Sequence, residues 1–187
     1  MAPQSWILLS SRVPREPTRL RLAIWRRLKR VGAILVHDAV WMLPADANTR
    51  EAFEWLAEEV EQQGGTAWVW EAAGLSPAQD RQAVELFRRE ADARYAEIGA
   101  SARAIRDAAV GGRRRGGRAR PPSDAVRAQA VRQLRGLDRA LRLERRRDYF
   151  RAGGRAAAAA QVGAAIAELE PKRPTANAEG ATRALGD

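Results

Sequence analysis

A repeat of apolar residues at spacings of three and four constrains this chain more than any other feature. It runs for about eight helical turns and consists of Val84, Phe87, Ala91, Tyr95, Ile98, Ala102, Ile105 and Ala109. This spacing places all of these side chains along one side of a helix. A helix of such length with one apolar side needs a partner surface, so the repeat predicts a helical assembly after residue 76.

A second long helix supplies a candidate partner. Ser123 is a typical N-cap residue, and the apolar residues that follow it are Val126, Ala130, Leu134, Leu137 and Leu141. The two helices are joined by a basic, glycine-rich linker over 111–122, so we expect an antiparallel helical hairpin. Tyr149, Phe150 and a last alanine-rich helix over about 154–169 are expected to pack on it. The polar segment 171–187 is predicted to be disordered.

The first part of the chain has a different pattern. Short β-prone runs at 5–13, 33–37, 40–43 and 66–71 alternate with helical patterns at about 17–31 and 49–63. The order βαββαβ is that of a ferredoxin-like fold. The predicted fold class is therefore α+β, with a ferredoxin-like domain over 5–72 and an arginine-rich helical region over 76–170.

Several local features refine this prediction. Asp38-Ala39 is expected to form a tight hairpin turn, and Asn48 with Glu51 resembles a capping box for the second helix. Two helices on one face of the sheet would bury most of the tryptophans. We therefore expect a common core that includes Trp6, Trp25, Trp41, Trp68 and Trp70.

The net charge of +10 is unevenly placed, because residues 1–76 hold as many acidic as basic side chains. On the second long helix, arginines recur at spacings of three and four, about 150° around the helix from the apolar residues. One cationic face of this kind can neutralise several phosphates of a nucleic acid. The linker adds further arginines as a basic arm. The predicted nucleic-acid-binding residues are Arg113, Arg114, Arg115, Arg118, Arg120, Arg132, Arg135, Arg139, Arg142 and Arg146.

Other classes of site are excluded by composition. The chain has no cysteine and one histidine, His37, so disulfides, thiolate metal sites and cysteine nucleophiles are absent. His37-Asp38 lacks a nucleophile and a third orienting group, so we interpret it as a turn. No catalytic residue, metal ligand or cofactor is predicted. Without a basic leader or an apolar run of about 18 residues, the protein is expected to be cytoplasmic and away from membranes.

The run RLAIWRRL at 21–28, followed by GA at 32–33 and AVWMLP at 39–44, resembles the N-terminal domain of the chromate-resistance family ChrB. The resemblance continues through 54–56, 64–65, 86–88, 95–98 and 147–150. More distantly, the first 72 residues resemble the ferredoxin-like module of PaaX-type repressors.

The resemblance implies a regulatory protein that binds DNA and serves chromate resistance. The alternative is a protein-interaction or dimerisation module of the same system without its own DNA binding. A homodimer could form through a sheet edge or through the long apolar repeat. Members of the family carry a second domain after this region, and if that domain senses chromate, this chain binds DNA or a partner without sensing. Whether chromate is a ligand of this chain stays open.

Overall fold

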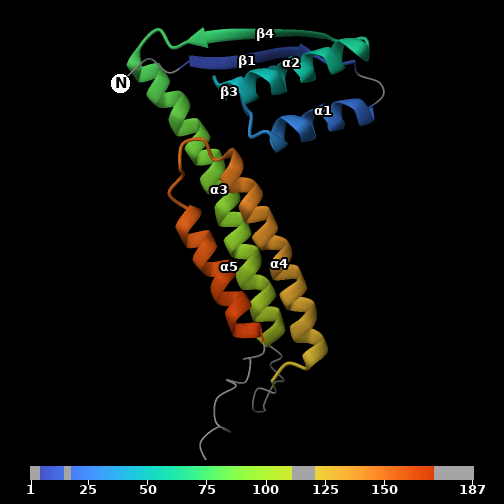
Figure 1. Ribbon diagram of the computed structural model, residues 1–187, viewed down its shortest axis with the longest axis vertical. Helices are drawn as coiled ribbons and strands as arrows, with labels where there is room; N and C mark the ends of the chain where they lie inside the picture. The colour runs from blue at the N-terminus through green and yellow to red at the C-terminus, as the bar shows by residue number, and fades with distance from the viewer. Residues whose placement is uncertain (1–4, 15–17, 111–120, 171–187) are drawn as a thin grey trace, which may run out of the picture.

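The computed structural model describes residues 5–14, 18–110 and 121–170. A sheet with two helices forms one end of the molecule, and three further helices extend away from it (Figure 1). The elements are β1 (Ser5–Arg12), α1 (Thr18–Arg30), β2 (Ile34–His37), β3 (Val40–Pro44), α2 (Ala47–Gln62), β4 (Thr66–Ala73), α3 (Pro77–Val110), α4 (Asp124–Arg147) and α5 (Arg155–Leu169).

The sheet has the order β2-β3-β1-β4, and every neighbouring pair is antiparallel. The central strand β1 pairs with β3 on one side and with β4 on the other, so that Leu9 lies opposite both Trp41 and Val69. This order with βαββαβ connectivity is the ferredoxin-like arrangement. The predicted α+β fold class is confirmed.

The core of this unit lies between the sheet and the helices α1 and α2. Alternate residues of a strand point to opposite faces, and Ile7, Leu9, Trp41, Leu43 and Ala67, which point to the helices, are buried. They meet apolar residues at helical spacing on α1 and α2. The buried residues are Ile7, Leu9, Ile24, Leu28, Ala33, Trp41, Leu43, Phe53, Leu56, Val60 and Ala67.

The cap of α2 differs from the prediction. Asp46, not Asn48, is the N-cap residue: its carboxylate accepts a hydrogen bond from the Thr49 amide at 2.9 Å. The Thr49 hydroxyl accepts one in return from the Asp46 amide at 2.9 Å. Asp46 has extended φ and ψ angles, which an N-cap residue requires. The capping box therefore starts two residues earlier than expected and does not include Glu51.

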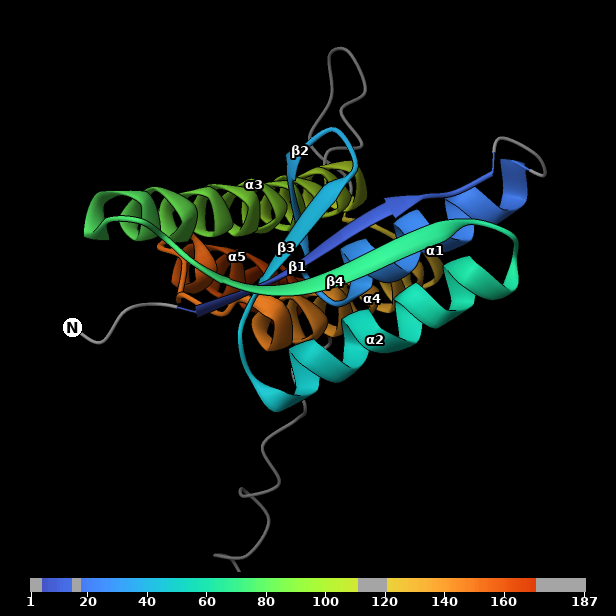
Figure 2. The same cartoon turned by 90° about the horizontal axis from the view of Figure 1, so that it is seen from above.

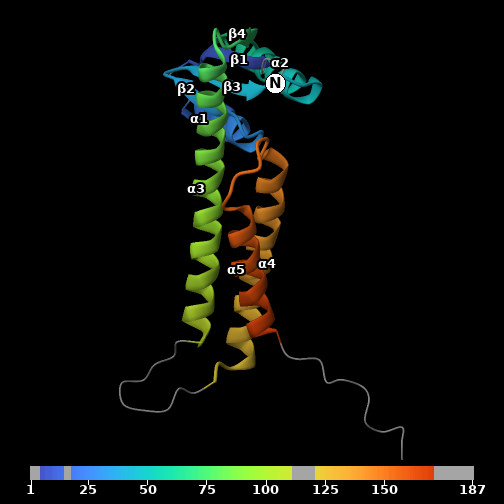
Figure 3. The ribbon, with the colours of Figure 1, turned by 90° about the vertical axis from the view of Figure 1, so that its left-hand side faces the viewer.

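The predicted helical hairpin is present. Helix α4 runs antiparallel to α3, and α5 packs beside both (Figures 1 and 3). The predicted apolar seam faces inward, because Ala130, Leu134 and Leu141 are buried and Leu137 packs against them. Of the predicted linker, only residues 121–122 are described, and the predicted disordered tail 171–187 lies outside the described residues.

A buried carboxylate joins the bundle to the sheet unit. Glu144 on α4 is 1% exposed and accepts hydrogen bonds from Arg94 Nε at 2.7 Å and from Arg147 Nε at 2.6 Å. Arg147 Nη1 also donates to the carbonyl of Lys29 on α1 at 2.7 Å. One charge cluster thus links α3, α4 and the end of α1.

Residues after α4 complete this junction. The Tyr149 hydroxyl donates to the Val31 carbonyl at 2.7 Å, and the Phe150 ring lies 5.3 Å from that of Phe87. Gly32 has a φ of +79°, and a Cβ atom there would lie 2.7 Å from the Arg147 Cβ. The expectation that Tyr149 and Phe150 pack on the hairpin was therefore incomplete, because Tyr149 also packs against the core of the sheet unit.

The expected common tryptophan core was wrong for three of its five members. Trp6 and Trp41 are buried, but Trp25, Trp68 and Trp70 are 50%, 65% and 55% exposed. Trp25 follows the buried Ile24 on α1, and the next residue of a helix is turned by about 100°. Trp68 and Trp70 lie on β4, on the sheet face opposite to α1 and α2. On that face Phe87 of α3 covers only the region around Trp6, Ile34 and Met42.

We predict that Glu144→Ala destabilises the protein strongly. The substitution leaves Arg94 and Arg147 without their shared buried carboxylate, and breaking a buried ion pair in this way costs about 3 kcal/mol or more. Chemical denaturation measures the change in the free energy of unfolding. Asp138→Ala is the matched control: it breaks an exposed pair with Arg142 on the same helix and should cost less than about 1 kcal/mol. Equal costs for the two variants would contradict the role given to Glu144.

We also predict that both tyrosines of the chain ionise at a higher pH than tyrosines in an unfolded chain do. Burial and then the nearby charge of Asp46 raise the pKa of Tyr149 to about 12. Burial and Asp148, to which its hydroxyl donates at 3.1 Å, raise the pKa of Tyr95 further. The unfolded chain ionises its tyrosines near pH 10. Stability is therefore retained below pH 10 and falls as the pH rises toward 12.

Absorbance of tyrosinate against pH tests this expectation. The folded protein should show almost no tyrosinate at pH 10.5, whereas the protein in denaturant should show more than half. In Tyr149→Phe the loss of stability between pH 10 and 12 should become shallower. A midpoint near pH 10 in the folded protein would contradict the buried placement of these hydroxyls.

Candidate nucleic-acid interface

The predicted arginines of α4 lie on its outer side. The cap explains where this helix begins, since Ser123 accepts a hydrogen bond from the Val126 amide. Its last turn holds three arginines, whose positive charges interact favourably with the negative end of the helix dipole. With the apolar seam turned toward α3 and α5, the opposite side carries the exposed arginines Arg132, Arg135, Arg139, Arg142 and Arg146.

These arginines fall into two groups. Arg135 pairs with Glu170 at 2.9 Å, and Arg142 pairs with Asp138 at 2.6 Å. Within the described residues, no carboxylate pairs with Arg132, Arg139 or Arg146. These three recur at intervals of seven residues and therefore share one side of α4. We call Arg132, Arg139 and Arg146 the arginine line.

Helix α1 carries a second basic surface. Its sequence TRLRLAIWRRLKR contains no acidic residue. Arg27 pairs with Glu59, and Lys29 pairs with Glu90 at 3.4 Å and lies over the Trp41 ring. Arg26 and Arg30 are exposed and have no such pair among the described residues. Helix α1 therefore leaves these two guanidinium groups open to a ligand.

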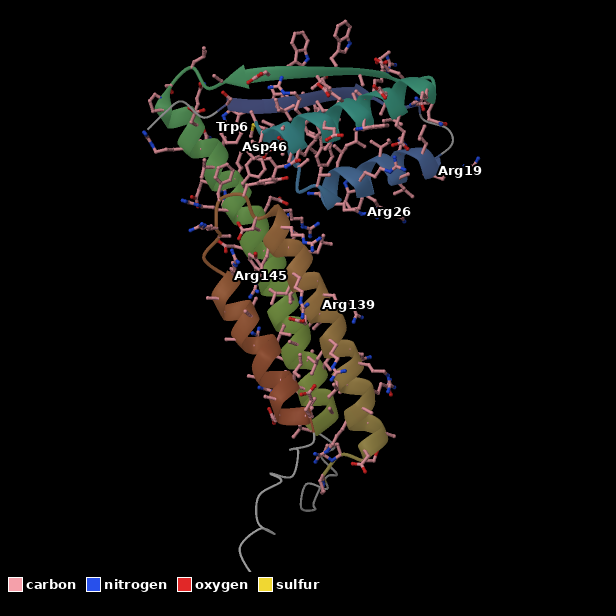
Figure 4. All side chains as sticks on the ribbon, in the orientation of Figure 1. Trp6, Arg19, Arg26, Asp46, Arg139 and Arg145 are labelled. Atoms are coloured by element: carbon pink, nitrogen blue, oxygen red, sulfur yellow. The ribbon has the colours of Figure 1, made fainter. Side chains whose placement is uncertain are left out.

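The two basic surfaces meet in a cleft. Arg30 of α1 and Arg146 of α4 both line a cleft of about 330 Å³, which Thr49 of α2 and Tyr149 also line. In Figure 4, α1 projects sideways above α4, with Arg26 on its underside and Arg139 on the side of α4 below it. The cleft thus sits at the inner corner between α1 and α4, and the arginine line leads away from it along α4.

Such a corner suits a polyanion. Guanidinium groups bind phosphate through a planar fork and keep their charge at any physiological pH. Exposed arginines from two helices can contact phosphates on two sides of one backbone without reading base sequence. The sequence did not predict that Arg30 lines a cleft with Arg146. Their proximity depends on the contact between α1 and α4, which is made at the buried Glu144 cluster. No local pattern around Arg30 signals it.

The remaining sequence-predicted positions divide as follows. The linker arginines Arg113, Arg114, Arg115, Arg118 and Arg120 lie outside the described residues. His37 is the last residue of β2, and Asp38 follows it in the turn. His37 Nδ1 lies 3.9 Å from Asp38 Oδ2, and both side chains are more than four-fifths exposed. Among the described residues, no cluster of three or more His, Cys, Asp or Glu side chains could hold a metal ion. None of the described helices is long and apolar enough to cross a membrane.

The fold and the site define an α+β protein in which a ferredoxin-like sheet unit is fixed to a three-helix bundle with an arginine-rich outer side. Residues 21–108 match the model of the family described as Protein ChrB, N-terminal. The matched segment runs from α1 through most of α3.

The chain is similar to the curated Protein ChrB of Cupriavidus metallidurans (strain ATCC 43123 / DSM 2839 / NBRC 102507 / CH34). It is 27% identical over 93 residues, which cover 50% of this chain and 28% of that protein. The matched segment thus spans little more than a quarter of the relative. No solved structure matches the chain.

Proposed function

We propose that this protein is a cytoplasmic, DNA-binding regulatory protein of the ChrB type that acts in chromate resistance. The ChrB match over residues 21–108 supports the chromate-resistance role. The observation that supports DNA binding is the arginine line, which is exposed and has no carboxylate partner among the described residues. Arg26 and Arg30 of α1 are exposed and unpaired in the same way. No catalytic step is assigned to it.

The two basic surfaces lie on helices that are connected by hydrogen bonds. Both α1 and α4 are tied to the Glu144 cluster, through Arg147 and the Lys29 carbonyl. Because these bonds hold α1 against α4, the distance between the arginines of the two helices stays constant. A DNA duplex that contacts the arginines of one helix can therefore contact those of the other at the same time. In our proposal the arginines at the corner between α1 and α4 bind the phosphates of the DNA backbone. The apolar seam of α4 has only a structural role, because it packs α4 against the bundle.

The arginine line can be tested with Arg132→Gln, Arg139→Gln and Arg146→Gln combined. Glutamine keeps helix propensity, so folding should hardly change. Affinity for duplex DNA should fall for specific and non-specific sequences alike. The slope of log K against log salt should become shallower by about 2–3 units, at about 0.9 per phosphate contact. Fluorescence anisotropy over a series of salt concentrations measures both quantities.

The matched control removes the same charge from α3, with Arg81→Gln, Arg89→Gln and Arg103→Gln combined. These arginines are also exposed, and this variant should keep most of the affinity and the salt slope. If both triple variants lose equally, only net charge matters and the proposed interface is wrong. If neither loses, the arginine line is ordinary solvated surface. Mobility shifts on the DNA upstream of the gene, with and without chromate, test the regulatory role.

A further inference from the structure

The two edges of the sheet are built differently. Strand β2 has four residues and an irregular register between Leu35 and His37, and short, bulged strands resist pairing with another chain. Strand β4 has eight residues, and all of them pair with β1 in an unbroken register. It contains no proline and one charged residue, Glu71. Long, regular edge strands with few charges readily accept a further strand.

This edge also carries the largest exposed aromatic pair of the described sheet. Trp68 and Trp70 are 65% and 55% exposed, and their rings stack with centroids 6.1 Å apart. Seen from above, no described helix lies over β4 (Figure 2). On the same face, Trp6 of β1 lies opposite Ala72 near the end of β4, and Phe87 of α3 covers it. Two large indoles without a cover mark an interaction surface.

We propose that β4 is a self-association edge: two copies of the chain pair antiparallel through β4 about a two-fold axis at Val69. In this register Trp68 of one copy lies opposite Trp70 of the second copy, and the four indoles form one cross-strand cluster. Glu71 lies opposite Ala67, so no like charges face each other. Closed two-fold pairing of this kind is the commonest form of self-association.

Helix α2 supports the same register. Arg50 near the start of α2 pairs with Glu71 at 2.8 Å, which sets its level along β4. Glu61 lies eleven residues later, about 16 Å along α2 and on the same side of the helix. Ala67 precedes Glu71 by four residues, or about 13 Å along β4. Glu61 of α2 is therefore expected beside Ala67, as Arg50 is beside Glu71. Because Glu71 faces Ala67 of the second copy, Arg50 of each copy faces Glu61 of the other.

The charges around β4 favour a second copy over a nucleic acid as the occupant. Proteins that stack bases on aromatic side chains line the groove with basic residues that follow the backbone. Beside Trp68 and Trp70, the opposed residues of β1 are Ser10 and Leu8, and only Arg12 at the end of the strand is basic. The arginine line lies on α4, away from β4, so this inference does not rest on DNA binding.

The first experiment measures the mass of the full chain by light scattering over a series of concentrations without DNA. A dimer is expected, and a monomer at every concentration overturns the proposal. Trp68→Lys with Trp70→Lys should raise the dimer dissociation constant about tenfold or more, because central tryptophans dominate such interfaces. Trp55→Lys is the matched control, since Trp55 is 66% exposed but lines a cleft with Arg27 on the far side of α2. It should leave the dissociation constant unchanged.

The second experiment tests the register. The chain has no cysteine, so Arg50→Cys and Glu61→Cys each introduce one thiol. A mixture of the two variants should cross-link to a dimer with a short bis-maleimide, whereas either variant alone should not. Circular dichroism checks that the variants stay folded. A dimer that survives the double lysine change, or that cross-links equally in all three samples, would show that β4 is not the interface.

Discussion

Glu144 is the residue on which the arrangement of the two parts depends. It occupies a position of the inward side of α4, where an apolar residue would continue the seam of Leu134 and Leu141. A buried carboxylate is costly unless it is paired and fully hydrogen-bonded. Arg94 and Arg147 satisfy it from two helices. Because a displaced partner would leave a buried charge, the packing of α3 on α4 at this level has one favourable register.

The same cluster also fixes the position of the sheet unit relative to the bundle. Arg147 completes its hydrogen bonds at the Lys29 carbonyl, where α1 ends. Gly32 allows this approach, because its positive φ and missing side chain let the backbone pass beside Arg147. Trp6, which donates to Asp80 at 2.9 Å, ties β1 to the first turns of α3. Charge and aromatic contacts thus fix the corner that Arg30 and Arg146 share.

The sequence predicted the elements far better than their contacts. Periodicity reports which side of an element is apolar, so the βαββαβ order and the seam of α4 followed from spacing alone. It does not report how much of a sheet face another element covers, and so the exposure of Trp68 and Trp70 was missed. Glu144 stands within an arginine-rich run of the sequence, which carries no sign of a buried carboxylate. Only the fold shows that it faces inward, and the part played by Arg30 depends on that contact.

The two proposed surfaces occupy separate parts of the molecule. The open edge of β4 lies on the side of the sheet unit away from β2, whereas the arginine line belongs to α4, which extends below the sheet unit (Figure 1). Pairing through β4 would leave both arginine lines exposed, related by the same two-fold axis. Each copy would then present its own basic corner to a polyanion. Because the Glu144 junction holds α4 against α1 in each copy, the distance between the two corners would be set by the sheet and not by a mobile hinge.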